Sequence, residues 1–424
     1  MLRHSMLLAL APGLVAQAPV RGQQLVTVTT ALADENVTAA RCFQNGIAAV
    51  PGGELFVLVV RAKKVAGERG ESWTSGLELW RSRDGSHGWQ RATAMTVRGA
   101  SDGAIVVDGD HLAVLCSATG DDAFGDVWFQ RFDPASSEWV GQPVSLMNGR
   151  GEEDQYFCYD LARTASGSLV AAIGSHRSPT LPGWASGWSS GARCLAAGGT
   201  EWSALQQANV GYSGVVANVV ARGETVEFVY RTIHEDTLLG LRTFDAAGGA
   251  FVEAKDVCVI APEHVGKNAN VGVVCLDGSG GRTVLHVSAA DMPGHGTLAV
   301  SFARPDGPVT TTTITADPPL LAGNENPGHF SLARGPGEQV FAYFSKVSEE
   351  HARLWQVVVE QGKPVVAPKV VVEGAPGQFQ GVTGQRASSV FSGLHVATSG
   401  HPAEHPTGVV AVFGAWPART LRAR

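Results

Sequence analysis

Short apolar segments recur about every 56 residues along this chain, and this repeat constrains the fold more than any other feature. Each segment opens on a polar or small residue, and successive openings lie 51 to 59 residues apart. The openings are Asn45, Asp102, Tyr156, Ser213, Asn270, His329 and Gln380. A Gly-rich turn and a second apolar segment follow each opening. Short, evenly spaced strands with turns between them predict an all-β propeller of four-stranded blades.

The second and third strands of each unit can be located in the same way. Second strands are expected at Leu55–Val60, His111–Cys116, Leu169–Ile173, Val226–Tyr230, Thr283–Val287, Val340–Phe344 and Leu394–Ala397. Third strands are expected at Leu77–Trp80, Val127–Phe132, Leu238–Phe244, Leu298–Phe302, Leu354–Val359 and Val409–Phe413.

The two ends of the chain complete the ring. The last unit ends soon after Trp416, while Leu25–Thr30 forms a good strand without a unit of its own. Pairing this N-terminal strand into the last blade would protect an open sheet edge. We therefore predict a seven-bladed β-propeller over residues 23–424 as a single domain. Six blades with an appended β segment is the alternative.

Composition excludes several functional classes. Only 17% of the residues are charged and the net charge is −7, which does not suit a nucleic-acid partner. No internal run reaches the roughly 18 apolar residues of a membrane span. We expect no cofactor and no metal, and a monomer. His401–His405 spells H-x-x-E-H, a zinc-protease pattern that requires a helix, but Gly400, Pro402 and Pro406 predict a loop. A structural metal bound by His401, Glu404 and His405 is the alternative for this loop.

The N-terminus indicates export. Arg3 and His4 precede an apolar run from Met6 to Ala16, which is typical of a signal peptide, predicted over residues 1–22. The protein is therefore expected to be secreted or periplasmic. Its six cysteines contain no C-x-x-C pair. Buried free thiols are favoured over disulfides, and no pairing is assigned.

One turn carries a resemblance to a known family. Ser82-Arg83-Asp84-Gly85-Ser86-His87-Gly88-Trp89 resembles the Asp-box, or BNR repeat, of sialidase-like propellers. The resemblance implies a capped hairpin, which supports the fold and not a chemistry. The catalytic residues of sialidases are not matched as a set. Phe43-Gln44-Asn45 stands where the family has its first arginine motif, Phe330 falls near the position of its nucleophilic tyrosine, and only Arg231 matches one of its other arginines.

Propeller geometry predicts where a site would form. The starts of the inner strands, the ends of the second strands and the following loops should meet at one mouth. The predicted catalytic residues there are Tyr212, Tyr156, His176, His329, Glu68 and Glu71. The predicted substrate-binding residues are Arg61, Arg177, Arg231, Lys346, Asp102, Asn45, Asn270 and Gln380.

This set of side chains suits an anionic glycan. Guanidinium groups bind carboxylate and sulfate oxygens through a planar fork. Tyrosine and histidine as acid and base, with arginine on a uronate carboxylate, would allow β-elimination. Glu68 or Glu71 with a second carboxylate such as Asp102 would instead allow glycoside hydrolysis. The remaining alternative is a non-catalytic binding or scaffold propeller whose sialidase-like site has decayed.

Overall fold

The computed structural model gives the arrangement of the strands. It describes residues 24–39, 45–67, 70–85, 87–97, 99–120, 123–149, 155–176, 188–208, 214–232, 239–252, 258–261, 273–277, 279–288, 297–304, 307–315, 330–347, 352–379, 381–384, 386, 394–405 and 407–415. The predicted signal peptide lies outside these residues.

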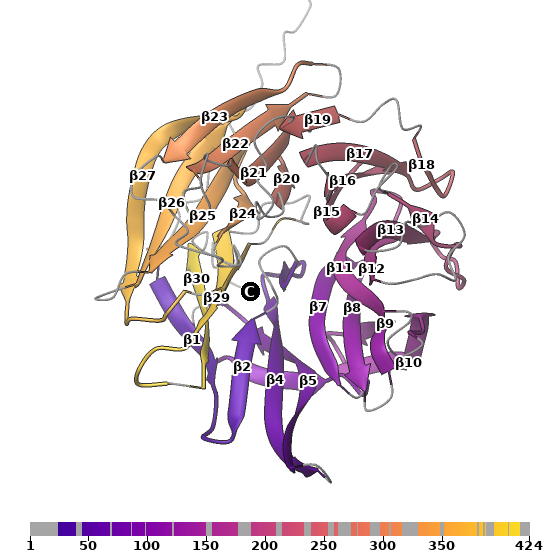
Figure 1. Cartoon of the computed structure of the whole chain (residues 1–424), viewed down its shortest axis with the longest axis vertical. Helices are drawn as coiled ribbons and strands as arrows, with labels where there is room; N and C mark the ends of the chain where they lie inside the picture. The colour runs from indigo at the N-terminus through magenta and orange to yellow at the C-terminus, as the bar shows by residue number, and fades with distance from the viewer. Residues whose placement is uncertain are drawn as a thin grey trace, which may run out of the picture.

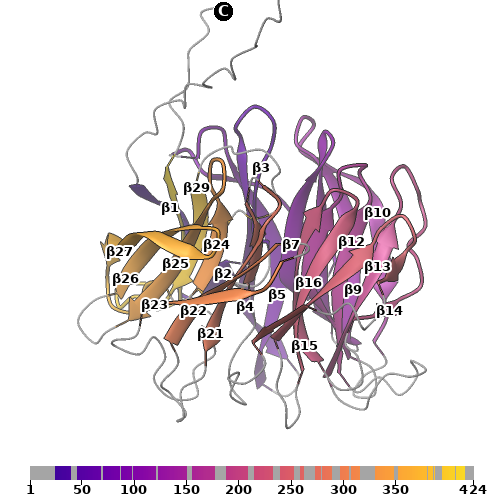
Figure 2. The ribbon, with the colours of Figure 1, turned by 90° about the horizontal axis from the view of Figure 1, so that it is seen from above.

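The described residues contain thirty strands in seven antiparallel sheets, and no helix. The sheets stand around a common axis (Figure 1), and the edge-on view shows them side by side (Figure 2). The first blade contains β2 (Glu35–Ala39), β3 (Ile47–Ala49), β4 (Leu55–Gly67), β5 (Gly70–Ser82) and β6 (Gln90–Ala94); the second contains β7 (Ala100–Asp108), β8 (His111–Gly120), β9 (Ala123–Asp133) and β10 (Glu138–Met147); the third contains β11 (Gln155–Arg163), β12 (Leu169–His176), β13 (Trp188–Leu195) and β14 (Gln206–Gln207). The fourth blade contains β15 (Gly214–Arg222), β16 (Thr225–Thr232), β17 (Leu239–Asp245), β18 (Ala250–Phe251) and β19 (Cys258–Ala261); the fifth contains β20 (Val273–Leu276), β21 (Arg282–Ser288), β22 (Thr297–Ala303) and β23 (Thr310–Thr315); the sixth contains β24 (Phe330–Arg334), β25 (Gln339–Val347), β26 (Ala352–Glu360) and β27 (Lys363–Gly374); the seventh contains β28 (Gly381–Gly384), β29 (Leu394–Gly400), β30 (Val409–Ala415) and β1 (Gln24–Thr30). The prediction of a seven-bladed propeller is confirmed.

Strand β1 closes the ring as predicted. It pairs antiparallel with β30, with Val26 opposite Val412 and Thr30 opposite Val409. It therefore supplies the outer strand of the seventh blade, whose other three strands come from the end of the chain. The last edge of the ring is thereby protected by a strand that lies nearly 400 residues away in sequence.

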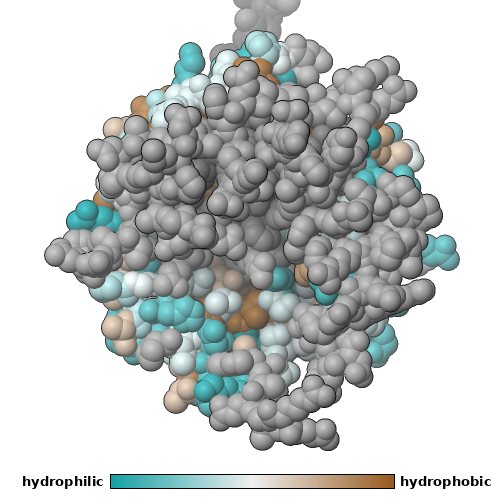
Figure 3. All heavy atoms as spheres, in the orientation of Figure 1, coloured by the Kyte–Doolittle hydropathy of each residue, from teal (hydrophilic) through white to brown (hydrophobic). Residues whose placement is uncertain are grey.

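Hydrophobic side chains fill each of the seven interfaces between neighbouring blades. One buried cluster joins the first and second blades, and further clusters follow in turn around the ring to the contact of the seventh blade with the first. In the last of these, Val28 of β1 packs with Val37 of β2 and Val412 of β30. The described surface in the view of Figure 1 is mostly hydrophilic or intermediate, with a hydrophobic area near the centre (Figure 3). The core of this protein is therefore a set of layers between sheets.

The inner edge of the first blade differs from the prediction. The sequence placed its start at Asn45, but β2 and β3 both pair with β4, β2 opposite Val59–Lys63 and β3 opposite Leu55–Val57. The inner strand is thus divided in two, and it begins at Glu35. The predicted second strands, by contrast, all fall within β4, β8, β12, β16, β21, β25 and β29.

The turn after β5 has the local geometry expected of a capped hairpin. The Oδ1 atom of Asp84 accepts the backbone amide of His87 at 3.2 Å, and Ser82 Oγ accepts the amide of Gly85 at 2.8 Å. Trp89 then packs against Ala49 and Leu55. The H-x-x-E-H segment forms turns, as predicted, and among the described residues no group of His, Cys, Asp and Glu is arranged to hold a metal ion.

Four of the six cysteines are buried free thiols, in accord with the favoured expectation. They are Cys116, Cys158, Cys194 and Cys275. Burial raises the pKa of Cys116 and of Cys275 to about 12. These thiols stay protonated at neutral pH and behave as small core side chains.

We expect Val28→Asp to destabilise the propeller by about 3 kcal/mol or more, because it buries a carboxylate between the first and seventh blades. Thr27→Asp is the matched control, since Thr27 is exposed on the same strand. Urea unfolding of both variants checks this. Equal stability of the two would show that ring closure through β1 contributes little.

Candidate functional site

A buried carboxylate, that of Asp160 in β11, lies near the propeller axis. Its Oδ1 atom accepts the backbone amides of Asn45 and Leu161, each at 3.0 Å. Its Oδ2 atom accepts the side-chain amide of Asn218 and the backbone amide of Val219, also at 3.0 Å. Asp160 is fully buried. One side chain of the third blade thereby holds the inner strands of the first and fourth blades.

Arg386, which follows β28, completes the set of hydrogen bonds around Asp160. Its Nη2 atom donates to Asp160 Oδ2 at 3.2 Å, and its Nη1 atom donates to Asn218 Oδ1 at 2.6 Å and to the carbonyl of Val274 at 3.2 Å. Burial raises the pKa of Asp160, and the Arg386 guanidinium and the backbone amides oppose that rise. Both charged groups are almost completely buried, so each supplies the main opposite charge that offsets the cost of burying the other.

Further hydrogen bonds connect Asn45 and the segment before Arg386 to the remaining blades. Asn45 Nδ2 donates to the carbonyl of Ile105 in the second blade at 2.6 Å. In the seventh blade, the Gly384 amide donates to Ser331 Oγ of the sixth blade at 2.9 Å. With Val274 in the fifth blade, all seven inner edges are tied together around the axis. These residues form the axial network: Asn45, Asp160, Asn218, Ser331, Gly384 and Arg386.

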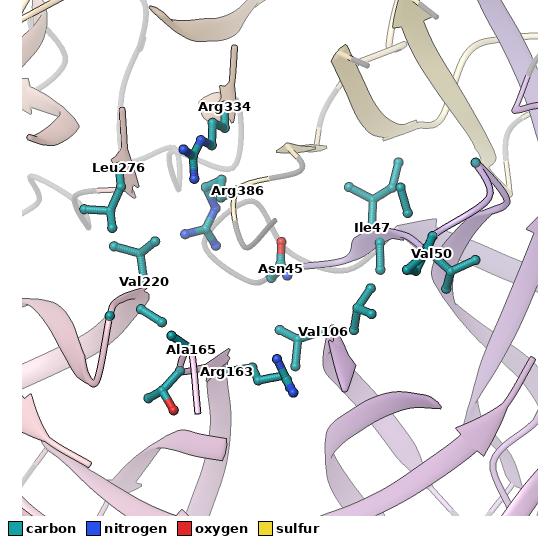
Figure 4. A pocket seen from close by; sticks show the side chains of 18 of the residues that line it. Asn45, Ile47, Val50, Val106, Arg163, Ala165, Val220, Leu276, Arg334 and Arg386 are labelled. Atoms are coloured by element: carbon teal, nitrogen blue, oxygen red, sulfur yellow. The ribbon is translucent and has the colours of Figure 1, made fainter. Parts of the chain in front are cut away.

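A cavity of about 680 Å³ lies on the axis at one side of this network. Figure 4 shows its lining, with Asn45 and Arg386 in the middle of the propeller. The other lining residues come from the ends of β3, β7, β11, β15, β20 and β24 and from the turns after them. The cavity therefore extends toward the end of the axis where the inner strands finish. The mouth predicted from sequence lies at the opposite end.

Three of the predicted site residues lie at or next to the ends of second strands. His176 is the last residue of β12, while Arg231 and Lys346 are next to last in β16 and β25. Their backbones pair with Gln155, Val215 and Arg353 respectively. Asp102 lies near the start of β7, half-buried, beside a bulge in its pairing with β8. Glu71 lies near the start of β5, opposite Ala66 of β4. Three blades thus carry a basic side chain or an imidazole at the same end of equivalent strands.

Arg61 has a different environment from the one predicted. Its guanidinium binds Glu35 and Glu78, with Nε 3.1 Å from Glu78 Oε2, and it donates to Thr29 Oγ1 at 2.9 Å. Only 12% of its side chain is exposed. Arg61 therefore joins β1 to the first blade, six residues before the end of β4, and its guanidinium is engaged within the fold.

Asn45 and Tyr156 also lie in packed surroundings. Asn45 is buried within the axial network and not at the start of an exposed inner strand. Tyr156 is buried in the hydrophobic cluster between the second and third blades. Phe330, which stands near the family position of the sialidase tyrosine, is buried in the cluster between the fifth and sixth blades. The other predicted site residues lie outside the described residues: Glu68, Arg177, Tyr212, Asn270, His329 and Gln380.

Sequence reasoning missed Asp160 and Arg386. For Asp160 a signal existed, because it is the only charged residue of β11 before the terminal Arg163. A lone carboxylate within a buried strand requires compensation from elsewhere in the fold. Arg386 follows β28 in a polar stretch and gives no comparable signal.

Solved structures of similar fold include polysaccharide lyases. A polysaccharide lyase named Uly1 superposes with a TM-score of 0.55 and 9% identity, covering 94% of this chain and 99% of that chain. An ulvan lyase of family PL25 superposes with a TM-score of 0.58 and 10% identity, covering 93% and 98%. A sialidase of Trypanosoma rangeli gives a TM-score of 0.46 and 12% identity over 92% and 75%. The likeness to the two lyases shows a shared propeller fold.

No protein-family model matches this chain, and no curated protein matches its sequence. Among the described residues, no helix is long and apolar enough to cross a membrane. The class that the structure defines is thus a seven-bladed β-propeller, similar in fold to polysaccharide lyases.

We expect Asp160→Asn to lower the free energy of unfolding by about 3 kcal/mol or more, because it leaves the Arg386 charge buried without its carboxylate. In the double variant Asp160→Asn/Arg386→Met part of this loss should be recovered, since both charges are then absent. Urea unfolding of the wild type, both single variants and the double variant measures the coupling. Additive losses would contradict the assignment of Asp160 as the partner of Arg386.

A second expectation concerns Arg61. Arg61→Ala should destabilise the protein by about 3 kcal/mol at neutral pH, because Glu35 and Glu78 stay buried with fewer partners. Burial alone would raise the pKa of Glu35, but hydrogen bonds from Lys63 and Arg61 outweigh it and lower the pKa below the ordinary value of glutamate. A lowered pKa stabilises the fold above the ordinary pKa of glutamate, and that stabilisation is lost as the pH falls through the folded value. The deficit of Arg61→Ala should therefore shrink as the pH falls below the ordinary pKa of glutamate.

The control for Arg61 is Arg353→Ala. Arg353 pairs with Glu373 at 2.9 Å, and both side chains are exposed, so its loss should be within about 1 kcal/mol. Thermal unfolding of both variants at several pH values gives the comparison. A pH-independent deficit in Arg61→Ala would rule out the ion pair with Glu35 as its cause.

Proposed function

We propose that this protein is a secreted carbohydrate-active enzyme that cleaves an acidic polysaccharide at the end of the axis where the inner strands begin. The observation that carries the proposal is the equivalent placement of His176, Arg231 and Lys346 at the ends of second strands. In a chain of net charge −7, basic residues at one end of the axis are suited to bind an anion. The proposal assigns that anion to the substrate.

Elimination is the reaction that this set of residues serves best. In a uronate lyase, a base removes the proton at C5 and a cation neutralises the neighbouring carboxylate. The electrons of the C5–H bond form the C4–C5 double bond, and the C4–O bond breaks as an acid protonates the leaving oxygen. We assign the carboxylate to Arg231 and Arg177, with Lys346 as a further cation. His176, Tyr212 and His329 are the candidates for base and acid.

The comparisons support this reading through the fold. Both lyases align over nearly their whole length with nearly the whole of this chain. One structure of the ulvan lyase is a complex with -[GlcA(1-4)Rha3S]-, a sulfated glycan that contains a uronic acid. That ligand carries the two kinds of anion that guanidinium groups bind.

A non-catalytic binding propeller is the second candidate. Two predicted site residues favour it, since Arg61 is held in ion pairs and Tyr156 is a core residue; Phe330, near the family position of the sialidase tyrosine, is a core residue as well. A hydrolase that uses Glu68, Glu71 and Asp102 remains the competing chemistry within the enzyme class.

The test is degradation of a panel of acidic polysaccharides, with new reducing ends and unsaturated uronate absorbance read in parallel. We expect both signals to appear together, and Arg231→Ala to lower turnover by about 100-fold or more through loss of a charge-assisted contact in the transition state. The matched control is Arg304→Ala, because the exposed Arg304 directly follows β22, at the end of the axis opposite the predicted mouth, and its guanidinium donates to the exposed Gln361.

The other possible outcomes would each contradict a part of the proposal. Reducing ends without absorbance would replace the lyase by a hydrolase. Full activity of Arg231→Ala would remove Arg231 from the site. Binding of the polysaccharide without any cleavage by the folded protein would establish the non-catalytic candidate.

A further inference from the structure

Two arginines share one carboxylate where the second and third blades meet. Asp108 is the last residue of β7, Arg131 lies in β9 of the same blade, and Arg163 is the last residue of β11 in the third blade. Arg131 Nε donates to Asp108 Oδ2 at 2.8 Å, and Arg163 Nε donates to Asp108 Oδ1 at 3.0 Å. The two guanidiniums are therefore neighbours on either side of a single carboxylate.

Only part of each guanidinium is used in these contacts. Within the part of the chain that the structure describes, Arg131 and Arg163 donate hydrogen bonds through Nε alone, so the Nη atoms of both remain available as donors. Each arginine side chain is 32% exposed, whereas that of Asp108 is 13% exposed. The donors are thus accessible to a dissolved ligand, while the carboxylate between them is largely covered.

The charges in ion-pair contact here leave a positive excess. Asp108 is the only carboxylate within ion-pair distance of either guanidinium among the described residues. Asp133, two positions after Arg131, is engaged in its own hairpin, where its carboxylate accepts a backbone amide and a serine hydroxyl, each at 2.8 Å. Asp110 is exposed in the turn after β7 and pairs with neither arginine. Two cations thus face one anion, and a second anion would complete an alternating set of charges.

Local contacts hold both guanidiniums in place. Arg131 Cζ lies 5.3 Å from the centroid of the buried Phe129 ring, which is a cation–π contact. Arg163 passes close to Gly167, where a Cβ atom would come within 3.0 Å of Arg163 Nη2. Gly167 also has a φ of +99°, so this position favours glycine on both counts. Donors that are held in place before binding lose less conformational freedom when a ligand arrives.

We propose that Arg131 and Arg163 form a binding site for a tetrahedral oxyanion, a sulfate or phosphate group that is either free or esterified on a larger molecule. The oxyanion accepts hydrogen bonds from the Nη atoms of both guanidiniums. A tetrahedral group presents separate oxygen atoms to two planar forks, whereas a carboxylate has only two oxygens to divide between them. Arg163 also lines the axial cavity of about 680 Å³, beside Val106 (Figure 4), so the site lies at the end of the axis opposite the predicted mouth. The proposal does not rest on the proposed function.

The experiment is titration calorimetry of the full chain at constant ionic strength, with inorganic sulfate, inorganic phosphate, glucose 6-sulfate and acetate as ligands. We expect sulfate and phosphate to bind at least about tenfold more tightly than acetate, since one additional charge-assisted hydrogen bond corresponds to about that factor. Glucose 6-sulfate binding as tightly as inorganic sulfate would support an esterified ligand, and binding of the inorganic ions alone would support a free one. Acetate binding as tightly as sulfate and phosphate, or no binding of either ion, would overturn the proposal.

Variants that keep the charge test the role of the guanidinium. Arg131→Lys and Arg163→Lys retain a cation beside Asp108 but lose the planar fork, and each should weaken sulfate binding by about tenfold. Arg304→Lys is the matched control, because the exposed Arg304 lies at the same end of the axis and its guanidinium donates to Gln361. Wild-type affinity in both lysine variants would remove these guanidiniums from the site.

Ala197 offers a test that leaves the ion pairs intact. It is exposed, and a Cβ atom at Gly167 would lie 3.8 Å from Ala197 Cβ and 3.0 Å from Arg163 Nη2, so a longer side chain at position 197 can reach Arg163. Ala197→Glu should compete with the ligand and weaken sulfate binding by about tenfold. Ala197→Gln, of equal size and neutral, should bind sulfate as the wild type does. Equal affinities of these two variants would contradict the placement of the oxyanion at Arg163.

This proposal and the enzymatic one can fail separately. Arg231→Ala should retain sulfate binding that responds to Ala197→Glu, even where turnover is lost. Sulfate binding that is lost in Arg231→Ala and unchanged in Ala197→Glu would assign the anion to the predicted mouth and overturn the site described here. Sulfate binding that responds to Ala197→Glu in a protein without polysaccharide cleavage would sustain this site and reject the enzymatic proposal.

Discussion

The contact between Asp160 and Arg386 is the constraint on which the centre of this propeller depends. Seven sheets that pack only through hydrophobic layers leave their inner edges facing a common axis, where polar backbone groups require partners. Asp160 accepts four amide donors and Arg386 donates to three acceptors there, and these partners belong to four blades. Neither residue would be stable alone in this setting, because a buried charge without its counterpart is strongly destabilising. The centre is consequently organised as one unit.

This organisation divides the axis into two unequal ends. On one side the strands finish in short turns, and the lining of the axial cavity is formed by residues whose positions the sheets determine directly. On the other side, His176, Arg231 and Lys346 lie last or next to last in their strands, and the connections after His176 and Arg231, residues 177–187 and 233–238, are longer than these turns. Longer connections on a rigid scaffold are the usual location of substrate-binding groups. The axial network lies between these two ends.

The fold could be predicted from the sequence because it depends on a local pattern that repeats. Every predicted second-strand segment lies within an observed strand, and Leu25–Thr30 lies within the closing strand, since apolar periodicity and sheet-edge protection are sufficient to place them. The axial residues could not be predicted in the same way. Asp160 and Arg386 are 226 positions apart, and nothing local to either shows the other. Arg61 illustrates the converse, because its position near a strand end suggested a substrate contact while Glu35 of β2, a strand absent from the prediction, binds it.

The arginines of this protein can be sorted by what opposes their charge. Arg61 and Arg386 have carboxylates that are themselves buried, and removing such an arginine affects the fold before any ligand. Arg193 and Arg242 donate to carbonyls of the preceding blade, Arg193 to Leu146 and Arg242 to Ala208 at 2.7 Å, so they join neighbouring sheets. Arg163 shares the carboxylate of Asp108 with Arg131, at 3.0 and 2.8 Å respectively. A residue type that suggested one anionic site therefore serves three physical purposes. Only arginines whose charge the fold leaves partly uncompensated are suited to bind an external anion.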